Sequence, residues 1–111
     1  MVKVITLLKR KKGITLEEFS RHWQEKHGAI VLKTVPGIKR YIQNHAVRLS
    51  AGGEPKIDGI AEVWYDDLEA WRQFADLYWG DKGKAILDDE ETFLDKSKLV
   101  FFVAEEKVIK P

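Results

Sequence analysis

The apolar residues of this chain change their spacing in a fixed order, and that order limits the possible folds more than any other feature. Val2–Leu8 alternates and is rich in β-branched residues, which predicts a strand. A helix is predicted over Leu16–Lys33, where apolar side chains recur at helical spacing. Thr15 and Glu18 match a capping box at its start, and the proline and glycine of "VPG" at residues 35–37 end it.

Two more strands are predicted after this helix. They cover Ile38–Leu49 and Ile57–Tyr65 and are separated by the loop "SAGGEPK". Alternation places Tyr41 and His45 on one face of the first of them and Asn44 on the other. Only one of these faces can meet the helices, and the sequence leaves open which one does.

The last part of the chain repeats the helix and strand patterns. Asp66 and Glu69 predict a second capping box, followed by a helix that reaches Tyr78 or Trp79. A further helical piece and a closing strand are predicted over Ala85–Leu94 and Lys98–Ile109. The order is that of an α+β protein with the ferredoxin-like split β-α-β-β-α-β pattern, in which both helices cover one face of an antiparallel sheet.

The whole chain, residues 1–111, is expected to form a single domain, because no repeat, low-complexity tract or linker divides it. Its strands are apolar on both faces, most plainly in "LVFFVA" at residues 99–104, and such a strand would promote aggregation if it were left bare. We therefore expect two copies to pair their sheets face to face as a homodimer.

Composition excludes several classes of partner. The chain has 19 basic and 18 acidic residues, so its formal charge of +1 gives no field to attract a nucleic acid or an anionic membrane. It has no cysteine, which rules out disulfides and thiolate chemistry. No segment approaches the ~18 apolar residues of a membrane span, and the amino-terminal stretch lacks the pattern of a signal peptide. We expect a cytoplasmic protein without a nucleic-acid or membrane partner.

Two of the three histidines lie within ten residues, in "FSRHWQEKHG" at residues 19–28. Helical spacing places His27 on the apolar face with Phe19 and Trp23, pointing to the sheet, and moves His22 to the flank. A histidine in that position suits proton transfer near neutral pH. The pair is five residues apart, about 140° around an α-helix, whereas metal chelation from one face favours a spacing of four, so no metal site is predicted. The acidic run at residues 88–91 is interpreted mostly as a solvated face.

Polar and aromatic side chains also occur where a purely structural sheet would carry valine or isoleucine. On the strands these are Tyr41, Asn44, His45, Asp58 and Trp64. On the later helix, Trp71 and Phe74 belong to an aromatic stripe. Together with the first helix they could line a pocket, in which Tyr41 or Asn44 would donate a hydrogen bond to a developing oxyanion.

The sequence resembles the EthD domain of the dimeric α+β barrel superfamily over nearly its whole length. The matching residues, in order, are Phe19, His22, Trp23, His27, Pro36, Gly37, Tyr41, Asn44, Asp58, Gly59, Asp88 and Phe93. The resemblance implies two ferredoxin-like subunits that close their sheets into a barrel, with one pocket per subunit between sheet and helices. Relatives include a methylmuconolactone isomerase and small decarboxylases and dehydratases of aromatic polyketides, which work without a cofactor. The histidine that is catalytic in them corresponds to His27. The isomerase also uses a cysteine, which this chain lacks, and the founding member is an accessory to a cytochrome system.

The leading functional hypothesis is a cofactor-free lyase or isomerase that acts on a small aromatic or lactone-like metabolite. Its predicted catalytic residues are His27, Tyr41 and Asn44. The predicted substrate-binding residues are His22, Trp23, His45, Asp58, Trp64, Trp71 and Phe74. The alternatives are a non-catalytic accessory or ligand-binding protein, and a haem protein with His27 or His45 as axial ligand. An RNA-binding domain of the same strand order is disfavoured, because "IDGIAEVWY" lacks the basic and aromatic recognition pattern.

Overall fold

The structure, a computed structural model, describes residues 1–49 and 53–111. The strands are β1 (Val2–Leu8), β2 (Arg40–His45), β3 (Gly59–Tyr65) and β4 (Val100–Ala104). The helices are α1 (Leu16–His22), α2 (Gly28–Thr34), α3 (Leu68–Tyr78) and α4 (Lys84–Phe93). A π-helical segment, Trp23–His27, joins α1 to α2, and short 3-10 turns cover Asp81–Gly83 and Lys96–Lys98. Residues 50–52 of the predicted loop lie outside the described residues.

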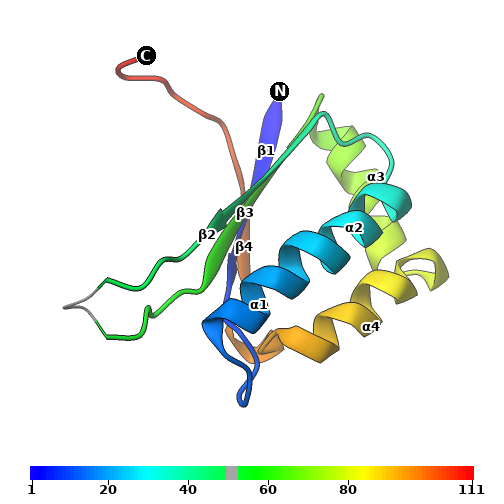
Figure 1. Ribbon diagram of the computed structural model, residues 1–111. Coiled ribbons are helices and arrows are strands. Elements are labelled where there is room, and N and C mark those ends of the chain that lie inside the picture. Colours follow the sequence, from blue (N-terminus) through cyan, green and yellow to red (C-terminus); the bar gives the residue numbers. More distant parts are fainter. Residues whose placement is uncertain (50–52) are drawn as a thin grey trace.

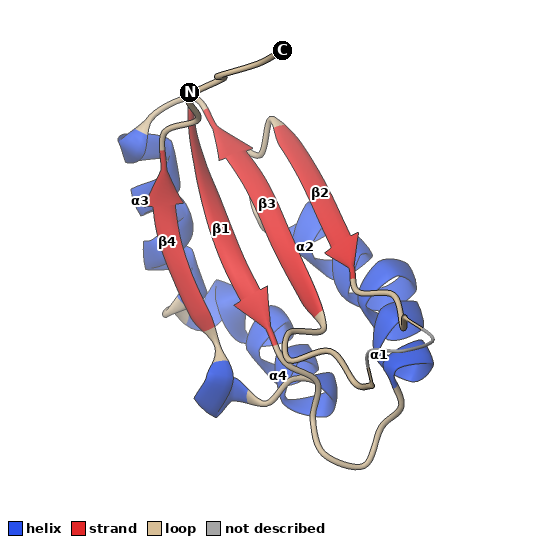
Figure 2. Cartoon of the chain, turned by 90° about the vertical axis from the view of Figure 1, so that its left-hand side faces the viewer, coloured by secondary structure: helices blue, strands red, loops and turns tan. Residues whose placement is uncertain are grey.

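The four strands form one antiparallel sheet in the order β2-β3-β1-β4. The helices all lie on one side of it (Figure 1), and the other side carries no helix (Figure 2). This is the ferredoxin-like arrangement that the sequence predicts. The first strand of the chain, β1, is a central strand, and the last strand, β4, pairs with it at the edge of the sheet. In this pairing Lys3 lies opposite Ala104.

The first helix begins as predicted but contains one wider turn. Thr15 Oγ1 accepts a hydrogen bond from the Glu18 amide, and Glu18 Oε1 accepts one from the Thr15 amide, both at 3.0 Å, which completes the capping box. In the π segment, the amide of Gly28 donates to the carbonyl of Trp23, five residues earlier. The predicted helix over residues 16–33 is thus confirmed, with one extra residue in its middle turn.

The start of α3 differs from the prediction. Its N-cap is Asp67, whose carboxylate accepts a hydrogen bond from the Ala70 amide at 2.9 Å. The predicted capping box of Asp66 with Glu69 is therefore wrong by one residue. Asp66 instead lies 3.5 Å from Lys39 Nζ in an exposed ion pair.

Three strands are shorter than predicted: β3 begins at Gly59 rather than Ile57, and β2 and β4 end early. Pairing of β2 with β3 stops at His45, opposite Gly59, so residues 46–49 continue beyond the ladder. At the carboxyl end, β4 stops at Ala104, and the exposed segment 105–111 runs away from the body of the protein (Figure 1). In β2 and β4, the sequence pattern from which the strand was predicted extends beyond the last residue that pairs with a neighbouring strand.

The core lies between the sheet and the helices and has two buried clusters. One gathers around Phe19, Trp23 and Phe93 and contains Leu8, Leu16, Ala61 and Leu94 as well. The other contains Val4, Val35, Tyr65 and Ile86. In β1 the buried side chains Val4 and Leu8 alternate with residues that face the opposite side, as expected for a strand with one face on the core.

The opposite face of the sheet is mixed in character. By register it carries Lys3, Ile5, Leu7, Arg40, Ile42, Asn44, Ile60, Glu62, Trp64, Val100, Phe102 and Ala104. We call this set the open face. Val100 and Phe102 on the edge strand β4 are about half exposed there, and they add large apolar side chains to this surface. Along the described chain, no helix has the length and apolar character needed to cross a membrane.

Candidate active site

The π segment brings the two helix histidines to one carboxylate. His27 Nδ1 lies 2.8 Å from Asp89 Oδ2, and His22 Nε2 lies 2.9 Å from Asp89 Oδ1. The expectation that these histidines diverge by 140° is wrong, because it assumed an uninterrupted α-helix. A π turn spans five residues, so side chains five apart project to nearly the same side.

Asp89 faces inward because of its position on α4. Ile86, Asp89, Glu90 and Phe93 recur at helical spacing and are all buried, so they form one face of the helix. The exposed Asp88 and Glu91 fit the predicted solvated face, and Asp88 pairs with Lys84 at 2.6 Å. For Asp89 and Glu90 that interpretation is wrong. Two carboxylates of an acidic run thus become part of the interior.

The surroundings of His27 keep it neutral and fix its tautomer. The ring is only 6% exposed, and burial lowers its pKa below the ordinary value, although the hydrogen bond with Asp89 partly opposes this. Since a carboxylate can only accept, Nδ1 carries the hydrogen and donates it to Asp89. Nε2 is then unprotonated and can take up a proton.

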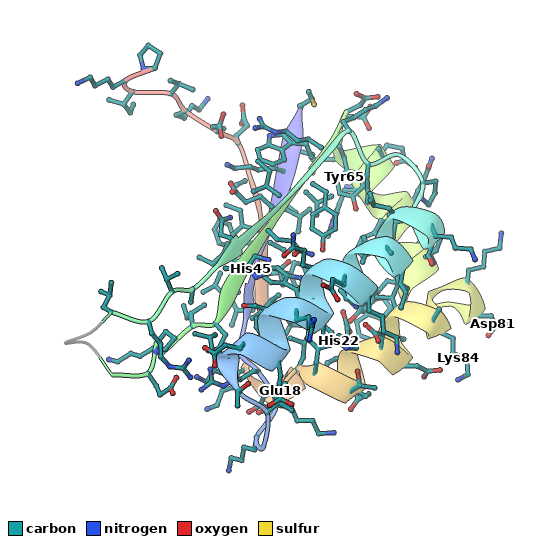
Figure 3. The ribbon with its side chains drawn as sticks, in the orientation of Figure 1. Glu18, His22, His45, Tyr65, Asp81 and Lys84 are labelled. Carbon is teal, nitrogen blue, oxygen red and sulfur yellow. The ribbon has the colours of Figure 1, made fainter. Side chains whose placement is uncertain are left out.

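His27 also lines a cavity. Among the described residues, Nε2 of His27 has no hydrogen-bond partner. Every completely buried side-chain nitrogen or oxygen in those residues does have a partner. Nε2 therefore keeps accessible surface, and His27 lines a cavity of about 100 Å³ between the sheet and the helices. The walls of this cavity include Trp23, Tyr41 and Phe74. Figure 3 shows Tyr65 pointing into the same layer from β3.

A wider groove adjoins the cavity. This groove, of about 350 Å³, lies where α3, α4 and β4 meet, and Trp71 and Phe101 form part of its wall. Six residues line both spaces: Val4, Thr6, Phe74, Tyr78, Glu90 and Leu99. The two spaces therefore share part of their walls. The cavity alone is smaller than the ~300–1,000 Å³ of typical ligand pockets, whereas the groove is within that range.

Strand β2 supplies Tyr41, with Gln43 as a link to the first helix. Gln43 Nε2 donates to Tyr41 Oη and to the Trp23 carbonyl, both at 3.0 Å. Gln43 Oε1 lies 2.9 Å from His45 Nε2, and the ring of His45 lies tilted by 39° against that of Trp23, with the ring centroids 4.5 Å apart. Burial raises the pKa of Tyr41, so its hydroxyl keeps its proton and can donate it in a hydrogen bond. The face of β2 that meets the helices is thus the one with Tyr41 and His45.

Three predicted site residues lie elsewhere. Asn44 and Trp64 are on the open face, because side chains alternate along β2 and β3. There Asn44 Nδ2 bonds Glu62 Oε2 at 2.9 Å, and Trp64 lies beneath Lys3 and Arg40. The prediction that they join the pocket beneath the helices is wrong.

Asp58 is also not a pocket residue. It is completely buried, and it accepts hydrogen bonds from the amide and the guanidinium of Arg10 at 2.8 and 3.2 Å. Its carboxylate therefore holds the segment after β1 and has no surface for a substrate. His22 is at the outer end of the Asp89 bridge, beside a surface depression, and His45 lies behind Trp23 (Figure 3). Within the described residues, no group of three histidine, aspartate or glutamate side chains is arranged to hold a metal ion.

Four residues of the site were not predicted: Tyr78, Asp89, Glu90 and Lys96. The sequence does contain a signal for Asp89 and Glu90, because their spacing places them on the same helix face as the apolar Ile86 and Phe93. Tyr78 was assigned to the core, and Lys96 had no local pattern.

Comparison with known proteins agrees with the fold. The model of the EthD domain matches residues 11–97. The chain belongs to the EthD family. It is similar to a Bacillus halodurans protein described as an ethyl tert-butyl ether d (EthD) family protein, with 28% identity, a TM-score of 0.70, and 96% of this chain and 99% of that chain covered.

More distant structures share the fold of this EthD chain. A Bacteroides fragilis protein, described as dimeric with a ferredoxin-like fold, has 15% identity and a TM-score of 0.65, with 95% of each chain covered. A hydroxynitrile lyase from Passiflora edulis has 9% identity and a TM-score of 0.67, with 99% of this chain and 96% of that chain covered. No curated protein matches the sequence significantly.

Proposed function

We propose that this EthD protein is a lyase or isomerase that works by acid–base catalysis without a cofactor, with His27 as the general base. The observations that carry this proposal are that His27 Nδ1 is held by Asp89 at 2.8 Å, that Nε2 has no hydrogen-bond partner among the described residues, and that His27 lines the cavity. Such a base is neutral near pH 7 and is oriented by a carboxylate, which are the two properties that proton abstraction needs.

In the proposed reaction, His27 Nε2 takes a proton from a carbon or hydroxyl of the substrate. The electron pair moves onto a neighbouring carbonyl oxygen or expels a leaving group. The Asp89 carboxylate stabilises the imidazolium that forms, and Tyr41 donates a hydrogen bond to the developing oxyanion. In an isomerisation His27 returns the proton to another atom of the product, and in a dehydration it protonates the leaving hydroxyl.

The substrate class follows from the walls of the site. The cavity and groove are lined mainly by aliphatic and aromatic side chains, with Trp71, Phe74 and Phe101 around the entrance. These walls suit a small aromatic or lactone-like metabolite. The lyase among the structural neighbours supports the reaction class by analogy of fold.

Substitution of His27 tests this function. We expect His27→Gln to reduce turnover by about 10²- to 10⁴-fold, the usual contribution of a general base. The measurement is product formation from a panel of aromatic β-hydroxy ketones and lactones. His45→Gln is a matched control, because His45 lies behind Trp23 and does not line the cavity. Undiminished turnover in a folded His27→Gln protein would exclude the proposed base.

A non-catalytic binding protein is the second candidate, and one observation favours it. The wider space is the groove, whereas His27 borders the cavity of only about 100 Å³. A ligand that occupied the groove alone would not reach the imidazole. In that case ligand affinity would be equal in the parent protein and in His27→Gln, and no member of the panel would be converted.

We further propose that residues 1–111 act as one domain that forms a homodimer through the open face. The half-exposed Val100 and Phe102 support this interface, because large apolar side chains on a sheet face are normally covered. The dimeric description of a structural neighbour supports it as well.

A further inference from the structure

A second polar group lies on the wall that the cavity and the groove share. Glu90 Oε1 accepts hydrogen bonds from Tyr78 Oη and from Lys96 Nζ, each at 2.6 Å. Glu90 is only 7% exposed, and both Glu90 and Tyr78 line the cavity and the groove, while Lys96 lines the groove alone. We call these three residues the entrance cluster.

The hydrogen bonds of this cluster leave one acceptor free. Both recorded bonds go to Oε1, and Oε2 of Glu90 has no hydrogen-bond partner among residues 1–49 and 53–111. Because no completely buried polar side-chain atom in those residues is without a partner, Oε2 keeps accessible surface. Glu90 lines both spaces, which leaves Oε2 as the acceptor available to a ligand there.

The charges around the site disfavour an anionic ligand. Among the described residues that line the cavity and the groove, Glu90 is the acidic one, and Lys96 is the basic one besides His27. They lie 2.6 Å apart and offset each other. A carboxylate ligand would thus meet Glu90 without finding an unpaired cation. Burial raises the pKa of Tyr78, and its hydroxyl is already donated to Glu90.

We propose that Glu90 Oε2 accepts a hydrogen bond from a hydroxyl group of a neutral aromatic ligand, whose ring lies in the groove beside Trp71 and Phe101. The site then selects hydroxylated aromatics over aromatic carboxylates and over aromatics in which the hydroxyl is blocked. This assignment rests on the proposed function, because it specifies the substrate class of the same site. Glu90 is a specificity residue and takes no part in the proton transfer to His27.

Three probes of the same ring size test the proposal: 2-naphthol, 2-methoxynaphthalene and 2-naphthoate. We expect 2-naphthol to bind at least tenfold more tightly than either of the others, the scale of a hydrogen bond to a charged acceptor. The readout is an NMR titration of the indole N–H signals. Trp71 should shift with the bound probe, whereas Trp64 on the open face should not, which places the ligand in the groove.

Glu90→Gln is the decisive variant. It keeps an oxygen acceptor for Tyr78 and Lys96 but replaces the free acceptor by an NH₂ donor and leaves Lys96 uncompensated. We therefore expect the affinity for 2-naphthol to fall about tenfold or more, and the affinities for 2-methoxynaphthalene and 2-naphthoate to rise. Glu91→Gln is the matched control, since it removes the same charge from an exposed neighbour that does not line the groove.

Equal affinities of the three probes in the parent protein, or the same order of affinities in Glu90→Gln, would overturn the role of Glu90. In that outcome the proposed function of His27 would be unaffected, because turnover in His27→Gln tests it separately. Failure of every probe to shift Trp71 would instead remove the ligand site itself, and with it both the proposed function and this inference. Undiminished turnover in His27→Gln, with the probe affinities of the parent protein and of Glu90→Gln as expected, would overturn the function of His27 and leave the role of Glu90.

Discussion

Asp89 is the residue on which the candidate site depends most. It bridges a buried imidazole on one oxygen and a partly exposed one on the other, and it comes from a different helix than both histidines. As a charged acceptor it fixes the proton of His27 on Nδ1 and stabilises the protonated ring. The orientation and the basicity of the general base therefore have the same source.

Replacement of Asp89 by asparagine should weaken the base while the fold is kept. The hydrogen bond and negative charge of Asp89 raise the pKa of His27, so in Asp89→Asn that pKa should fall further below its ordinary value of about 6.5. The imidazole C–H signals in NMR measure it directly. Turnover should fall with it, by up to about 10⁴-fold if the tautomer is also lost. Asp88→Asn, on the exposed side of the same helix, should change neither quantity, and an unchanged pKa of His27 in Asp89→Asn would contradict the bridge.

The lowered pKa of His27 also predicts how stability depends on pH. In the unfolded chain His27 takes up a proton near pH 6.5, whereas in the folded protein burial delays this to lower pH. Below pH 6.5 the unfolded state therefore binds more protons, and the free energy of unfolding falls as the pH falls. His27→Gln lacks this contribution.

Urea unfolding at several pH values between 7.5 and 5 would measure the effect. The difference in unfolding free energy between the parent protein and His27→Gln should be largest above pH 6.5 and should shrink toward pH 5. Burial lowers the pKa of His45 as well, but His45 is present in both proteins and cancels in the comparison. Parallel curves for the two proteins would show that His27 titrates normally.

At the scale of single elements, the caps and turns decide where each side chain points. The π segment Trp23–His27 adds one residue to a helical turn, and Gln43 donates to the Trp23 carbonyl within it. Trp23 itself packs against β3 at Gly59, where a Cβ atom would come within 2.5 Å of its ring. The glycine and the wide turn together seat Trp23 on the sheet and direct His27 to α4.

The N-cap of α3 gives a direct test at this scale. Asp67→Ala removes the hydrogen bond to the Ala70 amide and should lower the unfolding free energy by about 1 kcal/mol. Asp66→Ala, its matched control, removes only an exposed ion pair with Lys39 and should change stability by less than about 0.5 kcal/mol. Thermal or urea unfolding compares the two, and a larger loss in Asp66→Ala would restore the capping box expected from sequence.

Local periodicity was sufficient to predict the elements, because strands and helices bury their apolar residues at different spacings. It was also sufficient for His27 and Trp23, which face the core at helical spacing. It failed for Asp89 and Glu90, because their acidic side chains favoured a solvated position although their spacing places them on the buried face of α4. The faces of β2 could not be predicted, since strand alternation separates Tyr41 from Asn44 without saying which meets the helices. The π turn has no sequence signature that would reveal it.

At the scale of the whole molecule, the open face is the largest feature that the chain leaves uncovered. Ile5 and Phe102 are opposite each other across β1 and β4, and Ile42 extends the apolar surface on β2. The pair of Lys3 with Glu62 at 2.8 Å adds a neutral polar spot. A second copy of the sheet would bury these apolar side chains.

Phe102→Glu should therefore prevent dimerisation. A charge in the centre of an apolar interface is costly to bury, so the variant should sediment as a monomer at concentrations where the parent protein is dimeric. Leu32→Glu is the control, because Leu32 is 61% exposed on α2, away from the sheet. Analytical ultracentrifugation distinguishes the species, and a dimeric Phe102→Glu protein would exclude the open face as the interface.

The place of β1 in the sheet has a consequence for synthesis on the ribosome. β1 is made first, yet one of its two neighbours is β4, which is made last. The sheet therefore cannot be completed until residues 100–104 have left the exit tunnel, and the contacts that close it join segments almost a full chain length apart. Until then, one edge of β1 has no partner strand, and the nascent chain is exposed to edge-to-edge association.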